Sequence, residues 1–215
     1  AGAIVFGALT TMRAQRRSFG VRVSTSPVLR NLLQHYPSGG QFISEALQNA
    51  EDTDRATKFC AVLDLQHHPT DQIRQDHRTW RERFQGPAIL FYDDGGFRDR
   101  DWESLQQIYN SEKRHSPSEV GKYGMGSRSF FHIGDNIQIV SGTKYAVLDP
   151  DEKVSDNGEF GAILDMVTDD FEGKPFHQAY PDECAPFRDF FGCTMEGSFP
   201  GTIIRAPLRL KPWAS

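Results

Sequence analysis

Residues 36–53, YPSGGQFISEALQNAEDT, form the stretch from which the rest of the fold can be worked out. Pro37 and the pair Gly39-Gly40 interrupt regular structure, and apolar side chains then recur at the spacing of one helix face. These apolar side chains are Phe42, Ile43, Ala46, Leu47 and Ala50. The pattern predicts an amphipathic helix over residues 41–54 whose apolar stripe packs into a hydrophobic core.

The polar side of this predicted helix carries Glu45, Asn49 and Asp52. At 3.6 residues per turn these side chains fall within about 60° of one another, beside the apolar stripe. A solvated polar face is the simplest explanation of such a set in a single helix. The functional alternative is a carboxylate that orients water, next to an amide oxygen that binds a hard cation such as Mg²⁺. The helix by itself leaves both interpretations open.

The run PAILFY at residues 87–92 predicts a buried strand, and DDGG at residues 93–96 follows it directly. A carboxylate at a strand end can accept a hydrogen bond from the amino group of a base, and glycines let a flat ring approach the backbone closely. Asp and Gly are also the usual residues of a plain turn. This motif alone therefore indicates either a turn or part of a binding site.

Two further glycine-containing segments follow. GKYGMG at residues 121–126 precedes SRSFFHI, and glycines that expose N–H groups before a helix start are suited to anion binding. The order of these glycines differs from both the Rossmann fingerprint and the P-loop. Later in the chain, Pro200-Gly201-Thr202 opens a predicted strand, and this tripeptide by itself indicates no function.

The remaining segments predict helices and strands that are intermixed without regular βαβ units, which favours the α+β class. Residues 28–36 are expected to form a short helix, another helix begins at Asp99, and the polar residues 67–85 are expected to be an exposed excursion. Further strands are expected over residues 57–65, 136–141, 145–148 and 202–207.

Charge and composition exclude several kinds of partner. The 215-residue chain has a formal net charge of −5, whereas a nonspecific nucleic-acid binder normally has a basic excess. Its three cysteines lack metal-binding spacing and are consistent with reduced thiols in a cytoplasmic protein. The apolar residues 1–9 are too short to span a bilayer, and no basic segment precedes them. We therefore expect a cytoplasmic protein with no nucleic-acid or membrane partner.

The chain shows no break in composition that would separate two domains. Residues 18–211 are expected to form one domain. Residues 1–17 are expected to be an N-terminal extension, of which the apolar residues 1–9 are either a strand or sequence added to the natural chain.

The order of these motifs resembles the GHKL superfamily, which includes gyrase, heat shock protein 90 chaperones, histidine kinases and MutL-type proteins. Its members share a helix with Glu-x-x-x-Asn, a strand that ends in Asp-Gly, a glycine-rich loop and a late Gly-Thr. Longer blocks are similar to the sacsin repeat domain, and the resemblance extends from about Phe19 to Leu210. The blocks are YPSGGQFISEALQNAEDT, QGPAILFYDDGGFRDRDWESLQQI, VGKYGMGSRSFFHIGD, IVSGTKYAVLDPDE and FPGTIIRAPLRL.

The resemblance implies the Bergerat (GHKL ATPase) fold, an α+β two-layer sandwich of a mixed β-sheet covered by helices on one face. It also implies roles for the residues of the first helix. Glu45 matches the carboxylate that orients the attacking water, and Asn49 matches the residue that holds Mg²⁺ against the phosphates. Asp52 matches an acidic position on the ribose and phosphate side.

The other motifs would bind the rest of the nucleotide. The carboxylate that reads adenine falls at Asp93 or Asp94, next to Gly95, and Thr202 matches the threonine that supports this carboxylate, often through water. The positions expected at the lid hinge and phosphate loop are Gly121, Lys122, Gly124, Met125 and Gly126.

Two departures from the superfamily pattern affect these expectations. The Asp-x-Gly-x-Gly motif is one residue short here, and we favour Asp93 as the base reader because Asp93-Asp94-Gly95 preserves Asp-x-Gly. Ser127 stands where the chaperones usually have an aromatic residue.

The sequence leads to two functional hypotheses. The first is the ATP-binding domain of a sacsin-like chaperone or co-chaperone, with slow Mg²⁺-dependent hydrolysis of ATP to ADP and with client proteins or other chaperones as partners. The second is a non-catalytic sacsin-type domain that serves protein–protein interaction and binds nucleotide weakly or not at all.

Overall fold

The structure is a computed structural model, and it describes residues 40–74, 81–110, 126–150 and 161–209. The helix expected over residues 28–36 and the glycine-rich positions 121–125 lie outside the described residues.

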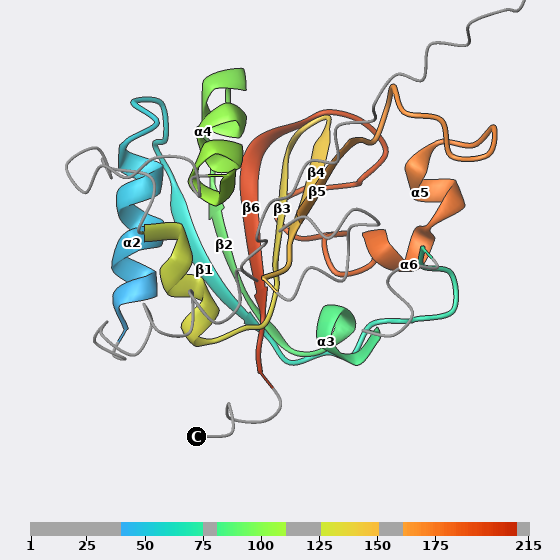
Figure 1. The fold of residues 1–215 in the computed structure, drawn as a ribbon, viewed down its shortest axis with the longest axis horizontal. Coiled ribbons are helices and arrows are strands. Elements are labelled where there is room, and N and C mark those ends of the chain that lie inside the picture. The colour runs from blue at the N-terminus through green and yellow to red at the C-terminus, as the bar shows by residue number, and fades with distance from the viewer. Residues whose placement is uncertain (1–39, 75–80, 111–125, 151–160, 210–215) are drawn as a thin grey trace, which may run out of the picture.

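A six-stranded sheet forms the centre of the domain, in the order β1-β2-β6-β3-β4-β5 (Figure 1). Each pair of neighbouring strands is antiparallel. The strands are β1 (Phe59–Asp64), β2 (Ala88–Asp93), β3 (Ile137–Gly142), β4 (Lys144–Leu148), β5 (Gly161–Asp165) and β6 (Phe199–Pro207). The last strand thus lies between β2 and β3, so it joins the two halves of the sheet.

Helices pack on both sides of the sheet, with α2 and α4 on one side and α5 and α6 on the other (Figure 1). The helices are α2 (Gln41–Glu51), α3 (Arg81–Gln85), α4 (Asp99–Asn110), the 3₁₀ helix η3 (Gly126–His132), α5 (Phe176–Ala179) and α6 (Pro181–Cys184). Of these, α2 also packs directly against η3.

Alternation along the strands produces two hydrophobic clusters, because successive side chains point to opposite faces. On β2, Phe91 belongs to the cluster under α2, α4 and η3, whereas Leu90 belongs to the cluster under α5 and α6. On β6, Ile204 belongs to the first of these clusters and Ile203 to the second. Both faces of the sheet are therefore apolar and need a cover.

The α+β class and a sheet with helices packed on it are confirmed. Two details differ from the expected architecture. The described strands are antiparallel throughout rather than mixed, and only β3 and β4 are joined by a tight turn. The second face is covered as well, because residues 176–195 contribute buried side chains to the cluster on that face.

Candidate functional site

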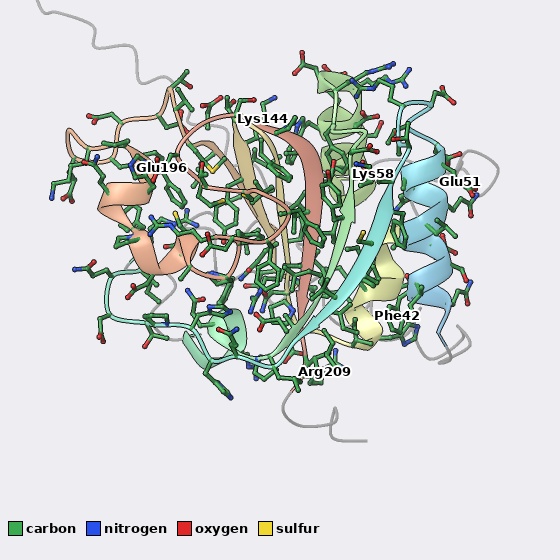
Figure 2. All side chains as sticks on the ribbon, turned by 180° about the vertical axis from the view of Figure 1, so that it is seen from behind. Phe42, Glu51, Lys58, Lys144, Glu196 and Arg209 are labelled. Atoms are coloured by element: carbon green, nitrogen blue, oxygen red, sulfur yellow. The ribbon has the colours of Figure 1, made fainter. Side chains whose placement is uncertain are left out.

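Three polar side chains lie side by side at the end of the sheet that carries Lys58 and Lys144 in Figure 2. Asp93 is the last residue of β2 and pairs with Thr202 of β6, which in turn pairs with Ser141 of β3. All three are buried, with exposed fractions of 7%, 0% and 0%. By the alternation along their strands they point to the face covered by α2 and α4.

Asp93 is the carboxylate in this row of three side chains, and its two carboxylate oxygens have different environments. Its Oδ1 accepts hydrogen bonds from the N–H groups of Gly95 and Gly96, at 2.9 and 3.3 Å. Its Oδ2 accepts no hydrogen bond from the described part of the chain. Burial raises the pKa of Asp93 above its usual range, although the two N–H groups oppose that rise. One oxygen is thus fixed by the turn, and the other is available to a ligand.

Asp94, the next residue, has a structural role. Its Oδ1 accepts from the backbone N–H groups of Thr57 and Lys58 at 2.6 and 2.9 Å, and its Oδ2 accepts from the Thr57 hydroxyl at 2.6 Å. These hydrogen bonds lower the pKa of Asp94 to about 2, with the Thr57 hydroxyl as the largest cause. Asp94 therefore ties the turn after β2 to the start of β1.

The turn after Asp93 requires glycine at two positions. A Cβ atom on Gly95 would lie 2.4 Å from the Thr53 hydroxyl. Gly96 has a φ of +65°, and a Cβ there would lie 2.6 Å from the carbonyl oxygen of Pro200. Arg55 also holds the turn, because its Nη2 donates to the Gly96 carbonyl at 2.7 Å. The segment after α2 and the start of β6 thus enclose the turn.

Ser141 holds the same turn from β3. Its hydroxyl accepts from the N–H of Phe97 at 2.8 Å and donates to the carbonyl of Gly201 at 2.8 Å. The Thr202 hydroxyl lies 3.2 Å from the same oxygen. Ser141 could not be recognised from the sequence, because a serine within a strand has no distinctive pattern until the strand pairing is known.

A cavity that is partly open to solvent lies between α2, α4, η3 and the sheet, and its empty space is about 600 Å³ when the adjoining open solvent is included. Apolar side chains of the sheet form its floor, and polar side chains of the two helices lie at its sides. Its lining residues are Asn49, Thr53, Phe97, Asp101, Ser104, Leu105, Phe130, Ile137, Ile139, Leu148 and Ile204. Asp93 itself is not a lining residue, but Thr53 and Phe97, which contact its turn, are.

The structure brings some of the predicted residues to this cavity. Asn49 lines it, and the Asn49 amide makes no hydrogen bond to the described residues. Glu45 lies one turn earlier on α2, is half-buried, and accepts a long hydrogen bond of 3.5 Å from Gln41. Asp52 caps the end of α2 through its backbone N–H, and Gly126 begins η3.

The described residues contain no group of three or more His, Cys, Asp and Glu side chains that could hold a metal ion. No helix in the same part of the chain combines the length and the apolar character needed to cross a bilayer.

Comparison with known proteins agrees with the motifs. Residues 23–215 match the model of the Sacsin domain family. Sacsin from Homo sapiens is 36% identical over 191 residues, which is 86% of this chain and 4% of that protein. The chain therefore spans only a small fraction of the length of this curated relative. The match to the family model and the identity to human Sacsin together show that this chain belongs to the Sacsin domain family.

Proposed function

We propose that this Sacsin domain binds an adenine nucleotide, ATP or ADP, between α2, α4 and the sheet. The observation that carries the proposal is the buried Asp93 carboxylate, whose Oδ1 is fixed by two N–H groups while Oδ2 accepts no hydrogen bond from the described residues. Oδ2 is not among the fully buried polar atoms that lack a partner, so it can be reached from outside the protein. An accessible acceptor beside a cavity suits a ligand that donates N–H.

The exocyclic amino group of adenine is such a donor. The apolar floor of the neighbouring cavity suits a flat ring. The raised pKa of Asp93 supports the same proposal, because perturbed carboxyl groups are concentrated at functional sites.

Asn49 fits the role of a Mg²⁺ ligand in this proposal. Its amide faces the cavity and makes no hydrogen bond to the described residues, and amide oxygens suit hard cations. Mg²⁺ would neutralise charge on the phosphates. Asn49 would hold that cation at the α2 side of the cavity, and Gly126, where η3 begins, would lie near the phosphates.

Slow ATP hydrolysis is the finer part of the proposal, with Glu45 as the general base. Glu45 would accept a proton from water as the water oxygen attacks the γ-phosphorus, and the bond to the bridging oxygen would break to release ADP. We expect Glu45→Gln to lower turnover at least about a hundredfold while nucleotide affinity changes little. Phosphate release and calorimetry on the same samples measure the two quantities, and unchanged turnover would exclude Glu45 as the base.

Calorimetry with ATP and ADP, with and without Mg²⁺, tests the binding itself. Asp93→Asn should weaken binding about tenfold to a hundredfold, because a hydrogen bond to a charged acceptor is replaced by one to an amide. Asp54→Asn is the matched control, since Asp54 is an exposed carboxylate just after α2. Absence of binding by the unaltered domain at millimolar nucleotide would contradict the proposal.

A non-catalytic interaction domain is the second candidate. It is favoured by Glu45, which does not line the cavity and bonds to Gln41 instead. Nucleotide binding without turnover, unaffected by Glu45→Gln, would support this candidate. In either case we propose that the domain acts in a cytoplasmic chaperone or co-chaperone whose partners are client proteins or other chaperones.

A further inference from the structure

The direction of the hydrogen bonds around Ser141 can be assigned from its neighbours. A backbone carbonyl only accepts, so the single hydroxyl proton of Ser141 goes to the oxygen of Gly201. The backbone N–H of Phe97 only donates, so it uses one lone pair of the Ser141 oxygen. The contact of 3.2 Å between Ser141 and Thr202 must then have Thr202 as the donor.

This assignment has a consequence for Asp93. Thr202 and Asp93 are directly paired across β6 and β2, on the same face of the sheet. Directly opposite residues have Cβ atoms about 5 Å apart, so a hydroxyl and a carboxylate at such positions can bond to each other. They do not do so here, because the proton of Thr202 is directed to Ser141 on its other side.

We propose that Ser141 is a positioning residue for the turn at residues 93–96, where the base would bind. Ser141 accepts the hydroxyl proton of Thr202 and thereby keeps Oδ2 of Asp93 open. This inference rests on the proposed nucleotide binding, in which that oxygen receives the amino group of the base. The register shift between Ser141 and Gly142 in the pairing of β3 with β6 supports it. Such irregularities re-aim a side chain, and here the serine hydroxyl reaches the Gly201 carbonyl.

Ser141→Ala removes the acceptor. The Thr202 hydroxyl then lacks its partner in a buried place. Asp93 is directly paired with Thr202 on the same face of the sheet, and its open Oδ2 can accept that hydroxyl proton. Two changes should follow. The pKa of Asp93 should fall, because a new donor stabilises the carboxylate, and affinity for ATP should fall about fivefold to tenfold, because the ligand must displace that donor.

The double variant Ser141→Ala/Thr202→Val separates this effect from a general loosening of the turn. Valine cannot donate, so the pKa of Asp93 should return toward that of the unaltered domain. ATP affinity should be about the same with serine or alanine at position 141 when position 202 is valine. Equal losses of affinity in both backgrounds, or an Asp93 pKa that does not fall in Ser141→Ala, would overturn the inference.

The pKa of Asp93 is measured by carboxyl ¹³C NMR of the ligand-free domain. Arg55 and Asp94, the charged groups that also shift this pKa, are the same in every variant. This measurement needs no nucleotide. If the expected pKa pattern appears but no variant binds ATP, the proposed function fails while the hydrogen-bond assignment holds. Ser141→Cys, which is close to serine in size and a weak acceptor, should shift the pKa in the same direction if the alanine variant does not fold.

Discussion

Asp93 and Asp94 are neighbours in the chain, but the fold places them in opposite electrostatic environments. Asp93 points into the buried row with Thr202 and Ser141, whereas Asp94 bonds to the start of β1. The two adjacent carboxyls therefore have pKa values displaced in opposite directions. The sequence alone favoured Asp93 as the base reader, and the geometry gives Asp94 a separate structural role.

For Asp93, stability and function are expected to oppose each other. Its folded-state pKa is raised, so its contribution to stability is present at low pH and is lost as pH rises through that pKa. An asparagine at position 93 does not ionise, so Asp93→Asn avoids the loss of stability at high pH. Its amide oxygen can still accept from the N–H groups of Gly95 and Gly96. The melting temperature of the variant should equal or exceed that of the unaltered domain at pH 7, and their difference should grow from pH 3 to pH 7. A lower melting temperature of the variant at pH 7 would contradict this.

For Asp94 the expected sign is reversed. Its folded-state pKa of about 2 lies below the usual value, so its contribution is present at neutral pH and is lost as pH falls toward that value. Asp94→Asn should therefore lower the melting temperature at pH 7, and the difference should shrink as pH falls from 4 to 2. Circular dichroism melts over this range measure it, and a difference independent of pH would show that Asp94 acts otherwise.

At the scale of elements, prediction from sequence succeeded where periodicity is long enough to be seen. The apolar stripe around Ala46 and Ala50 predicted α2, and the run from Ala88 to Tyr92 predicted β2. The short elements α3, β5, α5 and α6 were missed, because four or five residues contain too few repeats to separate a helix from a loop. The expected exposed excursion at residues 67–85 in fact ends in α3 and buries Ile73 and Phe84.

The missed helices α5 and α6 belong to the cover of the second sheet face, and their stability can be measured. Phe176 is fully buried and packs against Tyr145 and Tyr180, with ring centroids 5.5 and 5.7 Å apart. Phe176→Ala should destabilise the domain by about 3–5 kcal/mol in urea unfolding. Val167→Ala, at an exposed position, is the control and should change stability by less than about 0.5 kcal/mol. A small effect of Phe176→Ala would mean that this segment folds independently of the sheet.

At the scale of the whole molecule, the candidate site depends on three distant parts of the chain. The segment after α2, strand β3 and strand β6 all contact the turn at residues 93–97. Sequence motifs singled out the turn itself and Thr202, because their residues have distinctive chemistry, but not Thr53 and Arg55 after α2. Ser141 could not be predicted, because its role arises only from the pairing of β3 with β6.

Ligand binding should therefore stabilise the entire domain. ATP at about 100 times its dissociation constant is expected to add about 2.7 kcal/mol of stability, which corresponds to a rise in melting temperature of roughly 5–10 °C. Scanning fluorimetry with increasing ATP measures the shift. Asp93→Asn should show a smaller rise at the same concentrations, because binding that is tenfold to a hundredfold weaker leaves only about 0.4–1.4 kcal/mol of stabilisation. No rise for the unaltered domain at millimolar ATP would argue against nucleotide binding.

The position of β6 between β2 and β3 affects the folding of the domain during its synthesis. During translation β2 and β3 leave the ribosome long before β6, yet neither has its inner neighbour until residues 199–207 have emerged. Their inner edges stay open for that interval, and open strand edges pair readily with other chains. The nascent domain is therefore most prone to aggregate late in its synthesis, and a ribosome that stalls before residue 199 would carry a sheet still lacking its middle strand.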